Sequence, residues 1–204
     1  NNANSNYGIT ALSIQSASPA IENCNFNNNS YNVSITGDSK PVFVNFNFGA
    51  SVRTDAEANN IIMDLNSQPV FTNCNIAFNE KELRAVSIIA STVTVNNTLK
   101  KINFNGFENI TYCLYDLTTI AESASLTIEP GVVIKSRNSY TNLIANGTLT
   151  GIGTASEPII FTALSDDNFG NPADTENNGT TTPAYSTWGR IHLNSVSDSK
   201  LENW

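Results

Sequence analysis

The sequence predicts an all-β protein, a right-handed parallel β-helix in which short strands stack coil upon coil. One phrase of eight residues occurs three times, at residues 19–26, 41–48 and 69–76. These phrases start 22 and then 28 residues apart, and a period in the twenties is typical of a solenoid. Asn, Thr, Ile, Val and Phe are abundant, whereas strong helix formers are scarce. We therefore expect strands and turns, with little or no helix.

The repeated phrase reads Pro, apolar, apolar, any residue, Asn, Cys or Phe, Asn, and Phe or Ile. Alternate residues of a strand point inward, and equivalent positions of stacked coils lie about 4.8 Å apart. The expected inward rows are Ile21, Phe43 and Phe71, and Cys24, Phe46 and Cys74. Asn23, Asn45 and Asn73 should form a ladder at one turn, because Asn tolerates left-handed backbone and its amide can bond the amides above and below.

The three cysteines are expected to be free thiols. If Cys24 and Cys74 share one position two coils apart, their Cα atoms are separated by roughly twice 4.8 Å, beyond the ~7 Å limit for a disulfide. Cys113 alternates with apolar neighbours, so we expect it to be a small core residue.

The rest of the chain continues the strand rhythm as a single β-helix domain over residues 1–204. A charged run at Glu80, Lys81, Glu82 and Arg84 is expected to be a loop, followed by strand-like segments. The phrase returns in weaker form at residues 158–163 and 200–204. Because the chain stops within that phrase, we expect it to be a fragment of a longer solenoid.

Between residues 126 and 193, short apolar runs alternate with Gly, Pro, Asn and Ser, as in successive short strands. An Asp- and Asn-rich excursion at residues 166–187 interrupts them. We expect this loop to project from the solenoid and to be removable without unfolding it.

The formal net charge of −8 and a pI near 4.5 argue against a nucleic-acid partner, whose phosphates require a basic face. The same charge is compatible with a secreted or surface protein that binds cations. The sequence has no run of eighteen apolar residues, so it is not expected to span a membrane.

Three segments resemble a module of large secreted and cell-surface β-helix proteins of bacteria. They are LTIEPGVVIK at 126–135, NGTLTGIGTASEPIIFTALSDDNFG at 146–170, and WGRI at 188–191. The module is frequent in Bacteroidetes proteins that are exported with a C-terminal sorting domain, the type IX secretion route. The upstream phrases resemble pectate-lyase-like solenoids more generally. The resemblance implies a secreted or surface β-helix, often without assigned catalysis, and names no ligand.

The excursion is the candidate metal site. Its oxygen-bearing side chains offer the hard ligands that Ca²⁺ prefers, on a tight turn, and members of the resembling family carry DTNGDG where this chain has DTENNG. The candidate ligands are Asp166, Asp167, Asp174, Glu176 and Asn178. Calcium here would order the loop and be structural. The alternative is a solvated loop that is fixed by Asx turns.

The same carboxylates are weaker candidates for catalysis. Polysaccharide-cleaving β-helices use carboxylates around a groove, and Asp166, Asp167 and Arg190 are residues of the right type. Adjacent Asp side chains usually point apart, however, so we do not expect catalysis here. His192, the single histidine, alternates with Ile191 and Leu193 and is expected to face outward.

Taken together, these features favour a non-catalytic extracellular scaffold, either a rigid adhesin stalk or a surface that binds polysaccharides and other surface ligands. Its other partners would be segments of the same long chain. One alternative is a polysaccharide lyase or glycoside hydrolase whose catalytic coils lie partly outside this chain. Another is a cargo of a bacterial secretion system. Carboxylates that converge over a groove lined by aromatic rings would favour the enzyme.

Overall fold

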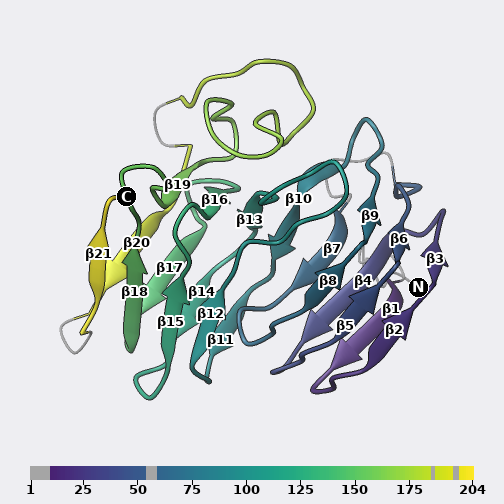
Figure 1. Cartoon of the computed structure of the whole chain (residues 1–204). Helices are drawn as coiled ribbons and strands as arrows, with labels where there is room; N and C mark the ends of the chain where they lie inside the picture. The colour runs from purple at the N-terminus through teal and green to yellow at the C-terminus, as the bar shows by residue number, and fades with distance from the viewer. Residues whose placement is uncertain (1–9, 54–58, 185–186, 195–197) are drawn as a thin grey trace, which may run out of the picture.

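The computed structural model describes residues 10–53, 59–184, 187–194 and 198–204. Their secondary structure consists of parallel strands, turns and loops, with no helix among the described residues. The strands stack into a β-solenoid, and the chain climbs along its axis from the purple N-terminal coil to the yellow C-terminal one (Figure 1). The predicted all-β solenoid of parallel strands is confirmed.

The longest sheet has seven strands and runs the length of the described solenoid. It contains, in spatial order, β1 (Thr10–Gln15), β4 (Tyr31–Thr36), β7 (Asn59–Met63), β10 (Leu83–Ile88), β13 (Tyr112–Leu114), β16 (Val133–Ser136) and β19 (Ile160–Ala163). Every third strand in sequence order belongs to this sheet, as expected for a coil with three strands.

On the other faces of the solenoid, one sheet ends partway along the axis and another sheet begins. The N-terminal coils form a sheet of β2 (Ala20–Glu22), β5 (Val42–Val44) and β8 (Val70–Thr72), and one of β3 (Asn25–Phe26), β6 (Asn47–Phe48) and β9 (Asn75–Ile76). Later coils form a sheet of β11 (Ser91–Val93), β14 (Thr118–Ile120), β17 (Asn142–Ala145) and β20 (Arg190–Leu193), and one of β12 (Asn97–Leu99), β15 (Ser125–Ile128), β18 (Thr148–Ile152) and β21 (Lys200–Glu202).

The register of β2, β5 and β8 confirms the equivalence of the three phrases. Ile21 pairs with Phe43, and Phe43 with Phe71. The Phe43 and Phe71 rings stack with their centroids 5.1 Å apart, and Phe43 is fully buried. The prediction that Cys24 is an inward core residue is wrong. Cys24 is exposed, whereas Cys74 is buried. The coil of Cys24 lies at the edge of its sheets, with a described neighbour on one side.

The predicted asparagine ladder is present at the turn between the second and third strands of these coils. Asn23, Asn45 and Asn73 have φ values of 56°, 52° and 50°, in the left-handed region. The Asn45 amide donates to Asn23 Oδ1 at 3.2 Å, and the Asn73 amide donates to Asn45 Oδ1 at 2.6 Å. Asn105 extends the ladder by donating to Asn73 Oδ1. The ladder therefore tightens the stack along one exposed corner.

One expectation about the later part of the chain needs correction, and one about its middle is confirmed. Residues 158–163 are not equivalent to the repeated phrase, because β19 pairs with β16 in the seven-stranded sheet. The charged run begins as the expected loop at Glu80, Lys81 and Glu82, whereas Arg84 already lies in β10. Glu82 is fully buried, and its Oε2 accepts hydrogen bonds from the amides of Ser51 (3.0 Å) and Asn79 (2.7 Å).

The outer face of the seven-stranded sheet carries a second apolar cluster near its C-terminal end. Tyr112 pairs with Val86 on one side and with Ile134 on the other, and all three residues belong to the main core. The next residues along each strand, Cys113 and Lys135 among them, therefore point outward. The second cluster consists of Leu83, Ala85, Cys113 and Leu164, with Tyr115 packed against it. These side chains are buried, so something covers this face.

Candidate functional site

The segment that covers this outer face is the excursion between β19 and β20. Asn171 N donates to Thr111 Oγ1 at 2.8 Å, Thr111 N donates to Asn171 O at 3.2 Å, and Arg84 N donates to Thr175 O at 2.9 Å. Figure 1 shows the yellow-green loop beside the ends of β16 and β19. The expectation that the loop projects free of the solenoid is wrong, because the outward apolar side chains of β10 and β13 need a cover.

Gly170 is the point of closest approach between the loop and the sheet. Its φ is +105°, which L side chains rarely adopt. A Cβ at this position would lie 2.6 Å from Thr111 Oγ1 and 3.3 Å from Lys135 Cε. The glycine therefore allows the loop backbone to lie directly against Lys135.

Lys135 lies at the centre of the covered face. Its side chain is fully buried, its Nζ donates to Ala173 O at 2.5 Å, and its Nζ is 3.9 Å from Asp167 Oδ1. Burial lowers the pKa of Lys135, and the carboxylates of Asp167 and Asp166 oppose that shift. Sequence analysis missed this residue, although a lysine within the apolar run VVIKS was a usable signal.

The adjacent carboxylates point apart, as expected. Asp166 is buried and accepts hydrogen bonds from Thr162 Oγ1 (2.6 Å) and from the backbone and side-chain amides of Asn168 (3.2 and 2.8 Å). Burial opposes its ionisation, but these hydrogen bonds outweigh burial and hold the pKa of Asp166 below its ordinary value. Asp167 Oδ2 accepts from the amide and hydroxyl of Thr181, at 2.6 and 2.9 Å.

The remaining candidate ligands divide between the buried cluster and an exposed turn. Asp174 accepts hydrogen bonds from the backbone amides of Asn178 and Gly179, both at 3.1 Å. The Asx turn that the alternative hypothesis expects lies at Asp166, which accepts from the backbone amide two residues on. Glu176 is half-buried, and its pKa is raised by burial and by the negative charge of Asp167. Asp167 thus faces Lys135, and the negative charges of Asp166 and Glu176 also act on that lysine.

No group of three or more His, Cys, Asp or Glu side chains within the described residues is arranged to hold a metal ion. The Lys135 ammonium supplies positive charge inside the carboxylate cluster. Calcium binding at Asp166, Asp167, Asp174, Glu176 and Asn178 remains a prediction. Arg190 and His192 lie exposed on β20, in a different sheet from the strand that precedes the excursion. The outward position expected for His192 is confirmed.

A pocket that sequence analysis did not predict lies where the sheets change. The sheet of β2, β5 and β8 ends at β8, and β12 belongs to the next sheet, so the two strands share no ladder of hydrogen bonds. The resulting cavity has a volume of about 310 Å³. Polar side chains of Ser67, Gln68, Thr98, Lys100 and Asn103 line it, together with apolar ones of Met63, Val70, Phe71, Leu99 and Ile102.

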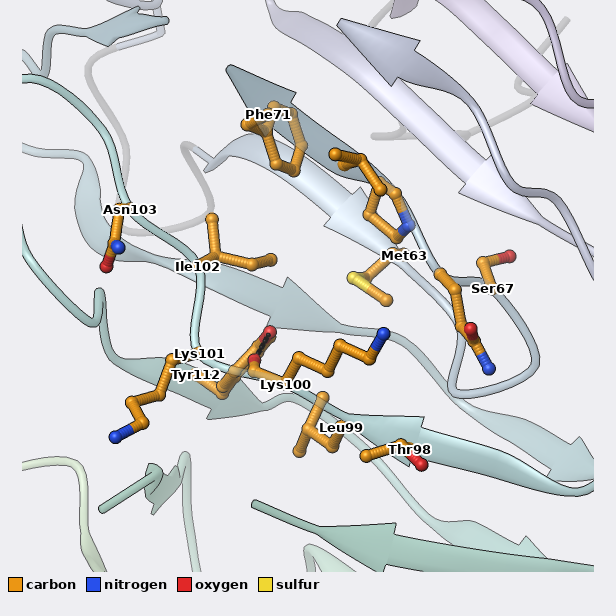
Figure 2. A pocket seen from close by; sticks show the side chains of 13 residues that line it. Met63, Ser67, Phe71, Thr98, Leu99, Lys100, Lys101, Ile102, Asn103 and Tyr112 are labelled. Atoms are coloured by element: carbon orange, nitrogen blue, oxygen red, sulfur yellow. Dashed lines mark hydrogen bonds between the residues drawn. The ribbon is translucent and has the colours of Figure 1, made fainter. Parts of the chain in front are cut away.

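Most side chains of this pocket come from residues 67–71 and 98–103, and Met63 and Tyr112 complete the lining (Figure 2). Phe71 lies on one side, and Leu99 and Lys100 lie on the other. The Lys100 side chain extends toward Met63, whereas Lys101 points away from the pocket and forms an ion pair with Glu157 at 2.7 Å. The Tyr112 hydroxyl donates to Lys100 O at 2.6 Å and fixes the backbone of this segment.

Comparison with protein-family models, with curated proteins and with solved structures found no match for this chain. Within the described residues, no helix is long and apolar enough to cross a membrane.

Proposed function

We propose that this chain is a non-catalytic β-solenoid of a secreted or cell-surface bacterial protein, which holds a saccharide-binding pocket on a rigid support. The observation that carries this proposal is the pocket between β8 and residues 98–103. It is concave, it combines an aromatic ring with amide and ammonium donors, and both of its walls are strands or segments tied to strands.

The chemistry of the lining indicates the class of ligand. Phe71 offers an apolar surface to a sugar ring, while Gln68 and Asn103 offer both donors and acceptors to hydroxyl groups. Lys100 places a positive charge at the pocket in a chain whose net charge is −8. An acidic saccharide, such as one with a uronic acid, fits these groups better than a cationic ligand does. At about 310 Å³ the pocket suits a short saccharide unit.

The buried carboxylate cluster supports a non-catalytic assignment. Lys135 and Asp167 do face each other, but their side-chain exposures are 0% and 5%. A polysaccharide has no access to atoms that the excursion loop covers, and this cluster is not a groove lined with aromatic rings. The two alternatives, a carbohydrate-active enzyme and a secretion cargo, both depend on segments outside residues 1–204.

The test is binding of a panel of short neutral and uronic-acid saccharides, measured by calorimetry. We expect one or more acidic saccharides to bind and the Lys100→Ala variant to lose at least about tenfold in affinity, because a charge-assisted hydrogen bond is lost. Lys40→Ala is the matched control, since Lys40 is exposed and pairs with Asp38 outside the pocket. Absence of binding to the whole panel, or equal binding by Lys100→Ala, would contradict the proposal.

A further inference from the structure

Lys135 and Asp167 form a buried ion pair, whereas three other ion pairs of the described residues are exposed or partly exposed. Their side chains are 0% and 5% exposed, and Lys135 Nζ lies 3.9 Å from Asp167 Oδ1. The exposed pair Lys101–Glu157 is closer, at 2.7 Å, but its side chains are 28% and 53% exposed. Burial removes the water that would otherwise separate the charges and hydrolyse an activated carboxyl group.

The second oxygen of Asp167 is held by two donors. Thr181 N and Thr181 Oγ1 both donate to Oδ2, at 2.6 and 2.9 Å. This leaves Oδ1 as the oxygen that faces the lysine. Two fixed donors on one oxygen of a carboxyl group are the arrangement that stabilises negative charge on that oxygen when a nucleophile adds to the carbon.

A third group completes the site. Glu176 interacts electrostatically with both Asp167 and Lys135, and it also lines a hollow of about 580 Å³ that Glu80, Arg137 and Asn178 share. The charge of Glu176 therefore acts on the reacting pair, and the residue borders space through which a small molecule can leave. The close approach of Gly170 to Lys135 Cε and the bond from Lys135 Nζ to Ala173 O hold the amine in place.

From this geometry we infer that Lys135 and Asp167 form an intramolecular isopeptide bond, with Glu176 as the group that relays protons. Lys135 Nζ adds to Asp167 Cγ, an N–C bond forms, and the bond from Cγ to Oδ1 breaks. Of the three protons of the ammonium, one stays on the amide nitrogen and two leave with Oδ1 as water. The ammonium and the carboxylate thus supply every atom, and no oxidant or co-reactant is needed.

Such a bond would join β16 to the excursion loop covalently. Lys135 would then be more than a buried counter-ion, because the cross-link would keep the loop on the outer face of the sheet. The inference does not depend on the saccharide-binding proposal, because it concerns different residues and a different measurement.

The test is the intact mass of the purified, denatured chain, followed by mapping of its tryptic peptides. We expect a mass lower than that of the sequence by one water molecule, about 18 Da. Trypsin should not cleave after Lys135, and the peptides containing Lys135 and Asp167 should be recovered joined. Cleavage after Lys101 in the same sample is the internal control. A native chain with the full sequence mass would overturn the inference.

Variants separate this bond from other losses of water, such as ring closure at Asp167 and Asn168. Lys135→Arg keeps the charge but removes the amine nucleophile, and Glu176→Gln keeps the shape of the relay. Both variants should show the full sequence mass while retaining the β-sheet signal in circular dichroism. Persistence of the mass loss in Lys135→Arg would assign it elsewhere and overturn the inference. Full cross-linking in Glu176→Gln would remove Glu176 from the reaction.

Discussion

Asn171 and Thr111 are 60 residues apart in the sequence and exchange two hydrogen bonds, from Asn171 N to Thr111 Oγ1 and from Thr111 N to Asn171 O. Thr111 directly precedes β13, and Asn171 lies within the excursion loop. The loop is therefore joined to the main chain of the seven-stranded sheet, and the solenoid has an extra layer on this face.

Replacement of Gly170 by alanine tests how tightly the loop is seated. Gly170 and Gly179 both have positive φ, at +105° and +88°, but only the added Cβ at Gly170 meets neighbours within 4 Å. Gly179→Ala should cost about 1 kcal/mol of unfolding free energy from backbone strain alone. Gly170→Ala should cost about 2 to 4 kcal/mol, because overpacking adds to that strain. Equal losses in urea unfolding would mean that the loop is not seated against Thr111.

Two substitutions of Asn45 separate the contribution of its left-handed backbone to stability from that of its side-chain hydrogen bonds. Asn45→Gly keeps the left-handed backbone and removes only the ladder bonds, so we expect a loss of about 0.5 to 1.5 kcal/mol. Asn45→Ala removes the bonds and also places a Cβ in a strained conformation, for a further loss of about 1 kcal/mol. Thermal or urea unfolding of both variants checks this. Equal stability of Ala and Gly at this position would contradict a left-handed Asn45.

The three thiols should differ in reactivity. Cys24 is exposed, whereas Cys74 and Cys113 are 1% and 0% exposed. Burial raises the pKa of Cys74, and it raises the pKa of Cys113 to about 12. A thiol-specific dye at pH 8 should label Cys24 alone in the native chain and all three cysteines after denaturation. Protection of Cys24, or rapid labelling of Cys113, would contradict the positions described for these residues.

Glu82 predicts a specific dependence of stability on pH. Burial raises its pKa above the ordinary value, and the amides of Asn79 and Ser51 only partly offset that shift. The folded state then binds the Glu82 proton more tightly than the unfolded state does. Its contribution to stability is present below the unfolded pKa, about 4.3, and is lost as pH rises through the raised folded pKa.

The Glu82→Gln variant isolates this effect, because glutamine does not titrate and the other groups are common to both chains. The free energy of unfolding of the wild-type chain, relative to that of Glu82→Gln, should fall as pH rises from about 4 toward neutrality. Urea unfolding at a series of pH values measures the difference. A difference that stays constant with pH would place Glu82 in solvent.

The repetitive part of the fold was predictable because the repeat itself encodes the register. Once the phrases containing Phe43 and Phe71 are aligned, alternation in a strand and stacking of coils place both rings in one row. The left-handed asparagines followed from the same alignment. The exposure of Cys24 did not follow from the alignment, because alignment does not show that its coil lies at the edge of its sheets.

The candidate site was only partly predictable, because its contacts join segments that share no repeat. The carboxylates of Asp166, Asp167 and Glu176 stood out as a group, but Lys135 is distant in sequence, and its place within the apolar run VVIKS was the one signal for it. Nor did the sequence reveal the pocket at Lys100, because that pocket arises from a break in pairing between β8 and β12. A local sequence pattern does not predict the strand at which one sheet ends and the next begins.

The excursion loop is an integral layer of the solenoid, and amide hydrogen exchange of Thr111 and Arg84 tests this most directly. Both amides donate to carbonyl oxygens of the loop, those of Asn171 and Thr175. We predict protection of both amides comparable to that of Val86, which donates to Thr111 O. Exchange of Thr111 and Arg84 at the rate of an unstructured peptide, with Val86 still protected, would contradict the claim.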